Sequence, residues 1–292
     1  MKILNSFGLI LLLVVAFTSC KKDKEESLSP EVKATAEKIS AKWEVAGANS
    51  PYQSFEFNES GNYIIVQNST YSTSLKSVNG GVVLYGTYKV IDSLTIALSD
   101  VGTVHINAIT DSGIEFSLEL EDGVGTTLEI VATKVAEMEY SERTKLLCRT
   151  WSLASIKIDG EENLESDEEF KVLFSEAGTY LVSERYYEEG AWTDWESDIS
   201  QWTWKNSSED VFCYSWDWES TVQCDGDNEV QITTLTSSKL VIVETWTWEE
   251  NNTEVTETDV FTLVPYNGLK SVSVINTNSN HNNSLKRGFF KR

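Results

Sequence analysis

Histidine, proline and basic residues are scarce in this chain of 292 residues, and each scarcity narrows what the protein can do. Two histidines, His105 and His281, leave little for histidine-based zinc sites or acid–base catalysis. Three prolines argue against a proline-rich or collagen-like chain. Only 23 basic residues stand against 46 acidic ones, and the net charge of −23 makes nucleic acid an unfavourable partner.

The motifs of several common enzyme classes are also missing. The sequence contains no P-loop, no nucleophile elbow and no HExxH zinc motif. Acidic runs at residues 159–169 and 225–229 could supply oxygen ligands, but the second run lacks the EF-hand spacing. Solvated acidic loops are the simpler interpretation. We therefore predict a protein without catalytic residues, without a cofactor and without a metal site.

No apolar run is long enough to cross a membrane as a helix, which takes about 20 residues. The longest run, residues 7–17, has eleven residues and follows Lys2. A short apolar stretch behind a positive residue at the N-terminus is typical of a secretory signal peptide. We predict that residues 1–19 form such a signal and that the protein is exported.

The first of the four cysteines, Cys20, stands directly after this segment. It follows Phe17, Thr18 and Ser19, and a charged run rich in lysine and glutamate comes next. This pattern resembles the lipobox of bacterial lipoproteins, and the charged run is typical of those from the Bacteroidota. The resemblance implies lipidation at Cys20, a linker over residues 20–28, and an outer-membrane lipoprotein that faces the periplasm or the cell surface. A plain secretory signal with an incidental cysteine is the alternative.

The other three cysteines cannot all pair among themselves. Cys213 and Cys224 flank a ten-residue segment and could bridge the two arms of a hairpin, as an exported protein permits. Cys148 lies at the end of an apolar helical pattern and is expected to pack as a buried thiol. Other pairings stay open at this point.

The sequence contains an internal repeat. Residues 57–66 and 174–183 share the pattern F-x-E-x-G-x-Y at an offset of 117, and a tryptophan behind a helical stripe precedes each copy. The matched residues are Trp43, Phe57, Gly61 and Tyr63 in the first copy and Trp151, Phe174, Gly178 and Tyr180 in the second. Because the matched residues occur in the same order in both copies, we predict a duplicated domain, with copies at residues 29–138 and 139–267. Residues 268–292 are expected to form a flexible basic tail.

Within each copy the pattern indicates β-structure. Segments such as 82–90, 94–98, 103–109, 114–120 and 126–133 are short, rich in β-branched and aromatic residues, and separated by turn residues. About eight strands in each copy predict an all-β protein of two tandem antiparallel up-and-down barrels, each preceded by a short helix.

The helix, the tryptophan on the first strand and the F-x-x-x-G-x-Y hairpin together resemble the lipocalin-like domains of Bacteroidota lipoproteins. The resemblance implies the barrel fold. Since lipocalins as a family bind small apolar molecules in the barrel mouth, it also suggests that kind of ligand.

Tryptophan is concentrated in the second copy, where eight of the ten lie between residues 192 and 248. Residues two apart on a strand share a face, and six of these tryptophans form such pairs. The pairs are Trp202/Trp204, Trp216/Trp218 and Trp246/Trp248. They are either barrel-core packing or a ligand platform that stacks on a sugar, a lipid or a partner protein.

These features together predict a membrane-anchored binding module without catalytic activity. Its expected partners are the membrane, through the lipid, and a small apolar ligand, a glycan or an envelope protein. One alternative is a structural or accessory subunit of an envelope complex with buried aromatic residues. The other is a hydrolase that acts on glycans.

Overall fold

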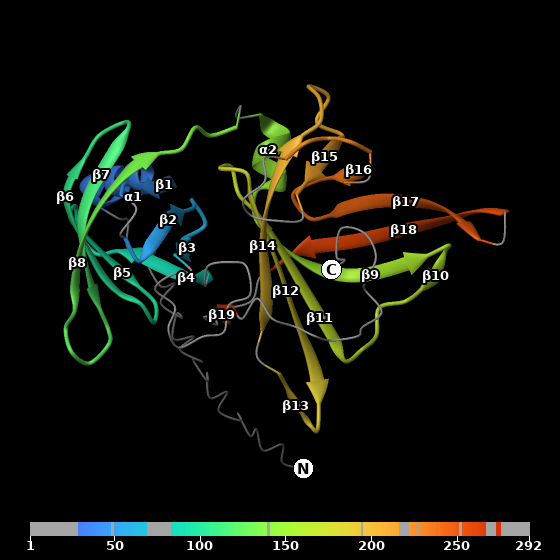
Figure 1. Ribbon diagram of the computed structural model, residues 1–292, viewed down its shortest axis with the longest axis horizontal. Coiled ribbons are helices and arrows are strands. Elements are labelled where there is room, and N and C mark those ends of the chain that lie inside the picture. The colour runs from blue at the N-terminus through green and yellow to red at the C-terminus, as the bar shows by residue number, and fades with distance from the viewer. Residues whose placement is uncertain are drawn as a thin grey trace, which may run out of the picture.

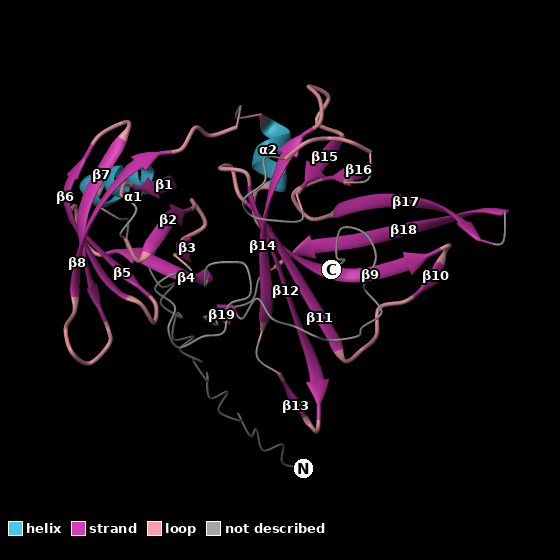
Figure 2. Cartoon of the chain, in the orientation of Figure 1, coloured by secondary structure: helices cyan, strands magenta, loops and turns pink. Residues whose placement is uncertain are grey.

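The computed structural model describes residues 29–47, 50–68, 83–138, 141–193, 195–215, 222–226, 228–250, 253–266 and 273–275. The chain forms two closed, eight-stranded antiparallel β-barrels in tandem, and a short helix precedes each (Figure 1). Figure 2 shows that strands make up nearly all of the regular structure. The all-β fold with two tandem barrels, predicted from the sequence, is confirmed.

The first barrel contains α1 (Pro30–Ile39), β1 (Ala41–Val45), β2 (Tyr52–Phe57), β3 (Asn62–Gln67), β4 (Val83–Val90), β5 (Thr95–Leu98), β6 (Gly102–Ile109), β7 (Gly113–Leu120) and β8 (Thr127–Lys134). Its strands pair in the order β4-β3-β2-β1-β8-β7-β6-β5, and β4 pairs again with β5 to close the barrel.

The second barrel contains α2 (Glu142–Leu147), β9 (Thr150–Ile158), β10 (Glu161–Glu162), β11 (Glu168–Phe174), β12 (Thr179–Glu188), β13 (Ala191–Trp192), β14 (Glu196–Trp204), β15 (Val211–Tyr214), β16 (Glu229–Leu235), β17 (Leu240–Glu250) and β18 (Thr253–Pro265). The barrel closes where β18 pairs with β9, while β10 and β13 only extend hairpins of β9 and β12.

Alternating hydrophobicity explains how each strand faces its barrel. On β7, Ile114, Phe116 and Leu118 are buried, whereas Glu115 and Glu119, which lie on the opposite face of the strand, are exposed. Successive side chains of a strand point to opposite faces, so a period of two places one apolar face inward. Each barrel therefore has its own apolar core.

The repeated motif occupies equivalent positions in the two barrels. Phe57 pairs with Tyr63 across the β2–β3 hairpin, as Phe174 pairs with Tyr180 across β11–β12. The glycine of each turn has a positive φ, 80° at Gly61 and 79° at its equivalent in the second copy, a conformation that other residues adopt only with strain. The same local structure has therefore been built twice.

Each tryptophan of the repeat joins a helix to its barrel. Trp43 Nε1 donates a hydrogen bond of 2.9 Å to the carbonyl of Ile39, and Trp151 Nε1 donates one of 2.8 Å to the carbonyl of Leu147. These carbonyls belong to the last turns of α1 and α2, where no intrahelical partner is available.

None of the helices in the described ranges is long and apolar enough to cross a membrane.

The two ends of the second barrel differ. α2 lies at the end with short turns, where Arg143 Nε donates to the carbonyl of Glu209 and Arg149 Nη1 to that of Ser237. At the opposite end, β17 and β18 continue past their neighbours as a long two-stranded hairpin (Figure 1).

One segment of the expected tail pairs with a barrel. The sequence predicted a flexible tail over residues 268–292, but β19 (Ser273–Ile275) pairs antiparallel with β4 of the first barrel and also contacts β14 of the second. Along Val83–Tyr85, β4 pairs with β3 on one side, while its pairing with β5 on the other side begins only at Tyr88. The backbone of Val83–Tyr85 can therefore accept β19 as an additional strand.

Candidate functional site

The first tryptophan pair lies inside the second barrel. Trp202 is 2% exposed, and its Nε1 donates to the carbonyl of Ser175 at 3.0 Å. Trp204 Nε1 donates to Thr144 Oγ1 of α2 at 2.9 Å, and the two rings meet edge to face with their centroids 5.2 Å apart. This pair is therefore core packing at the α2 end, which is one of the two interpretations that the sequence left open.

The other two pairs differ in position. Trp246 and Trp248 are half-buried on the part of β17 that pairs only with β18, opposite Glu257 and Val255. Trp216 and Trp218 lie outside the described residues, as does the predicted lipidation site Cys20.

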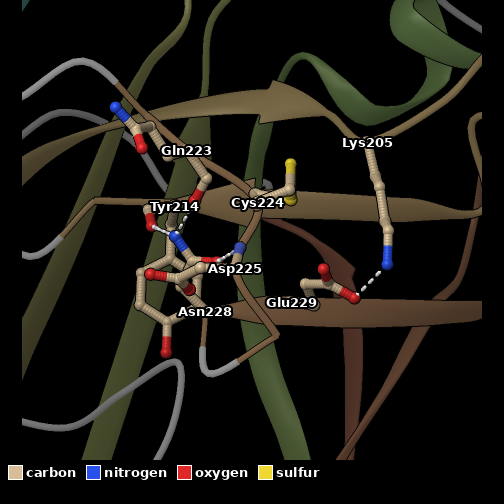
Figure 3. Close-up of a disulfide and its surroundings, with 8 residues drawn as sticks. Lys205, Tyr214, Gln223, Cys224, Asp225, Asn228 and Glu229 are labelled. Carbon is tan, nitrogen blue, oxygen red and sulfur yellow. Dashed lines mark hydrogen bonds and ion pairs between the residues drawn. A yellow bond between two sulfur atoms is a disulfide. The ribbon is translucent and has the colours of Figure 1, made fainter.

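A disulfide joins Cys213 on β15 to Cys224 in the following loop, with the Cα atoms 5.5 Å apart. Close to it, Asn228 Nδ2 donates to the carbonyls of Tyr214 and Gln223, both at 2.6 Å (Figure 3). Closing a loop of this length stabilises a fold by about 3 kcal/mol in the chain-entropy description. The bridge and the asparagine together fix the ends of the β15–β16 connection.

The acidic runs take part in local contacts. Glu229, at the end of the run 225–229, is the first residue of β16 and forms an ion pair with Lys205, which directly follows β14 (Figure 3). In the run 159–169, Glu162 accepts hydrogen bonds from Ser155 Oγ at 2.6 Å and from the Ile156 amide at 3.0 Å. These carboxylates stabilise turns and hairpins.

Large side chains fill the barrel interiors. The fully buried ones in the first barrel include Trp43, Tyr63, Phe55, Phe57 and Phe116, and those in the second include Trp151, Trp202, Tyr214, Phe170, Phe174, Phe212 and Phe261. Protein interiors of this kind are close-packed, with few voids larger than a water molecule. The filled interiors leave little room for a ligand, so the outside of the barrels is the better place for a binding site.

A groove of about 1210 Å³ lies between the two barrels. Its walls come from β2, β3 and β4 of the first barrel and from β11 and β12 of the second, and β11 and β12 are the equivalents of β2 and β3. Where the walls meet, an apolar cluster joins Ile64 and Val83 of the first barrel to Leu173 and Leu181 of the second. Ile64 and Leu181 differ by the repeat offset of 117, so equivalent outer faces pack against each other.

A buried polar network crosses the same contact. Thr179 Oγ1 donates to Glu56 Oε2 at 2.6 Å, and Lys42 Nζ donates to the same hydroxyl at 3.4 Å. Glu56 and Lys42 are 4% and 7% exposed. Burial lowers the pKa of Lys42, although the Glu56 and Glu44 carboxylates oppose the shift.

The glutamates of the repeated motif face the groove from both sides. Glu59 and Glu176 both line it. Burial raises the pKa of Glu176, and the charges of Glu59 and Glu137 raise it further. Two motif positions that lie far apart in the sequence therefore interact electrostatically across the groove.

The second barrel also contributes a buried lysine to the groove. Lys171 on β11 is 7% exposed, and its Nζ lies 3.3 Å from the ring centroid of Trp195 and 4.8 Å from that of Tyr266. The guanidinium carbon of Arg185 on β12 also lies over this ring, 4.5 Å from the Trp195 centroid. The ammonium and guanidinium groups thus share one indole ring.

Cys148 is a free cysteine at the end of α2, half-buried against the second core, and it lines the groove. Burial raises the pKa of its thiol well above the usual value, and the negative charges of Glu176 and Glu56 act in the same direction. A thiol of raised pKa carries little thiolate and is a weak nucleophile. Its role is therefore packing.

Sequence reasoning did not find the groove or Lys171. The groove exists only because the outer faces of two domains meet, and Lys171 occupies an outward position of an ordinary strand pattern. The available signal was the repeated motif, whose Glu59 and Glu176 both reach the groove.

Comparison with protein-family models finds no match for this chain, and a search of curated proteins finds none either.

Proposed function

We propose that this chain is an exported, lipid-anchored binding protein that holds a short oligosaccharide in the groove between its two barrels, without catalysing a reaction. The observation that carries this proposal is the groove of about 1210 Å³, built jointly by both barrels while large side chains fill their interiors. Pockets for a single drug-sized molecule measure roughly 300–1,000 Å³, so this groove suits a ligand of several units.

The lining favours a polar ligand over an apolar one. Hydroxyl, amide and carboxylate side chains come from the first barrel, and Tyr85 and Tyr266 add aromatic rings. The polar groups include Asn58, Glu59, Ser60, Asn62, Thr87 and Ser99. Sugar hydroxyl groups can exchange hydrogen bonds with such side chains, while aromatic rings provide apolar area together with a polar tip. The second copy contributes through the groove instead of through Trp202 and Trp204.

Blocking the groove should weaken binding. Ala177 is half-buried in the β11–β12 turn and lines the groove, so Ala177→Trp would place an indole ring in the ligand's volume. We expect the Ala177→Trp variant to bind the oligosaccharide at least tenfold more weakly than the unmodified protein does. Isothermal titration calorimetry with tetrasaccharides of neutral and acidic sugars, and with a long-chain fatty acid, measures this.

The matched control is Val124→Trp, in a turn of the first barrel where the native side chain is 86% exposed and does not line the groove. It should bind as the unmodified protein does. If Ala177→Trp binds every ligand of the panel as tightly as Val124→Trp does, or if no oligosaccharide binds, the proposed function is wrong.

Anchoring through Cys20 has its own test. Changing Cys20 to serine removes the thiol to which lipid would be attached, and it should move the protein from the membrane fraction to the soluble exported fraction. Two or more acyl chains give stable attachment, since each buried CH₂ contributes about 0.8 kcal/mol. Fractionation with intact-mass measurement follows the change, and a variant that stays fully membrane-bound would contradict the anchor.

A further inference from the structure

Lys171 is a buried cation without an anionic partner among the described residues. The residue is only 7% exposed, yet it makes no salt bridge with any residue that the structure describes. The nearest carboxylate on the same strand, Glu169, is engaged with Arg185, whose Nη2 lies 2.5 Å and whose Nε lies 2.7 Å from Glu169 Oε2. Because burying an unpaired charge is costly, this arrangement needs an explanation.

The neighbours of Lys171 are neutral hydroxyl groups and aromatic rings. The strand register places Ser152 of β9 on one side and Ser183 of β12 on the other, while Trp195 and Tyr266 contact its Nζ. Ser183 accepts a hydrogen bond of 2.6 Å from Ser197 Oγ. The proton of the Ser183 hydroxyl can therefore be donated to a ligand.

This cluster opens into the groove. Lys171, Ser183 and Tyr266 all line it, and Lys171 and Ser183 are register partners on β11 and β12, so the ammonium group and the hydroxyl are placed to contact the same bound group. An ammonium group offers three donors, and a carboxylate offers about four lone-pair sites on two oxygens. The donors therefore match an oxyanion.

We propose that Lys171 and Ser183 form an anion subsite that binds the carboxylate of an acidic sugar, such as a uronic acid, in the groove. This inference rests on the proposed function and specifies its ligand class. Lys171 donates to one carboxylate oxygen, Ser183 donates to the other, and Tyr266 packs against the sugar ring. Acidic residues outside the groove act weakly here, because charges beyond about 8 Å are screened at physiological ionic strength. Glu59 and Glu176, which line the groove, oppose the binding of an anion. The subsite therefore depends on the direct contacts of Lys171 and Ser183.

The subsite should also respond to pH. Burial and then the Arg185 charge lower the pKa of Lys171 to about 7, while Glu169 opposes them. Among the described residues, these two are the charged groups acting on Lys171, and Tyr266 is the titratable group packed against it. Only the protonated amine attracts a carboxylate, so binding should weaken as pH rises above 7 and be accompanied by proton uptake.

The test uses tetragalacturonate and its fully methyl-esterified form, which has the same sugar backbone but carries neutral methyl esters in place of the carboxylates. Calorimetry on the full chain between pH 6 and 9 should show galacturonate affinity falling by up to tenfold per pH unit above about 7. Affinity for the ester should stay flat. Lys171→Met should reduce galacturonate binding to that of the ester, and Lys171→Arg should restore binding without the pH dependence.

Lys239→Met is the matched control, because Lys239 is an exposed lysine in a turn away from the groove, and it should behave as the unmodified protein does. If acid and ester bind equally and Lys171→Met changes neither, the subsite is wrong while the proposed function stands.

A second measurement applies even if no oligosaccharide binds and the proposed function fails. Galacturonate monosaccharide should protect Lys171 from acetylation by acetic anhydride, read by mass spectrometry, and galactose should not. Equal labelling with the two sugars overturns the subsite.

Discussion

Replacing Trp43 or Trp151 with alanine should lower the free energy of unfolding of the barrel concerned by about 3–5 kcal/mol, the usual cost of truncating a fully buried tryptophan. Both residues are 0% exposed. Each removal creates a cavity in the core and leaves the carbonyl of Ile39 or Leu147 without its indole donor. A stable domain has only about 5–15 kcal/mol in total, so either variant should be close to unfolding.

Hydrogen exchange with mass spectrometry measures this effect for each barrel separately. Trp43→Ala should accelerate exchange mainly in peptides from residues 29–138, and Trp151→Ala mainly in those from 141–266. Phenylalanine at the same positions keeps most of the buried ring and loses the N–H group, so it should cost less than alanine. Two alanine variants with unrelated effects would contradict the structural equivalence of the two copies.

The barrels could be predicted from the sequence because the repeated motif specifies the backbone conformation of a hairpin turn. A glycine between Phe57 and Tyr63 specifies a hairpin turn with positive φ, and the same spacing in the second copy specifies the same turn. Alternating side chains then determine which face of each strand turns inward. The predicted segments 103–109 and 114–120 correspond to β6 and β7 at Gly102–Ile109 and Gly113–Leu120.

The contact between the barrels could not be predicted in the same way. In the sequence, an outward apolar residue such as Leu173 or Leu181 cannot be distinguished from any other strand residue. It is buried only because the other barrel packs against it. The tryptophan pairs were ambiguous for a related reason. Spacing of two places Trp202 and Trp204 on one face, but spacing cannot tell whether that face is the inside of the barrel.

Removing Glu56 should have the second-largest effect on stability. Glu56→Ala takes the acceptor away from Thr179 and the nearby negative charge away from Lys42, while that lysine stays buried. Breaking a buried charged network by removing one partner usually costs about 3–5 kcal/mol. Urea-induced unfolding measures the loss, and Glu115→Ala, on an exposed position of β7, is the control that should change little.

The pH dependence separates this explanation from a simple loss of packing. Because the pKa of Lys42 is lowered in the folded protein, the unfolded chain binds more protons between that pKa and the ordinary value of 10.5. Stability then rises with pH across this window, since the slope follows the excess of protons bound by the unfolded state. Without Glu56 the pKa of Lys42 should fall further, so Glu56→Ala should lose more stability at pH 7 than at pH 10.

A double variant tests the same contact without its charges. Lys42→Met combined with Glu56→Leu replaces the charged groups with apolar ones, and such replacements of buried ion pairs are often neutral or stabilising. We expect it to be more stable than Glu56→Ala alone, and independent of pH in this range at that site. If the double variant is as unstable as Glu56→Ala and shows the same pH dependence, the charge on Lys42 is not the cause, and the contact between the barrels depends on the shape of the Glu56 side chain instead.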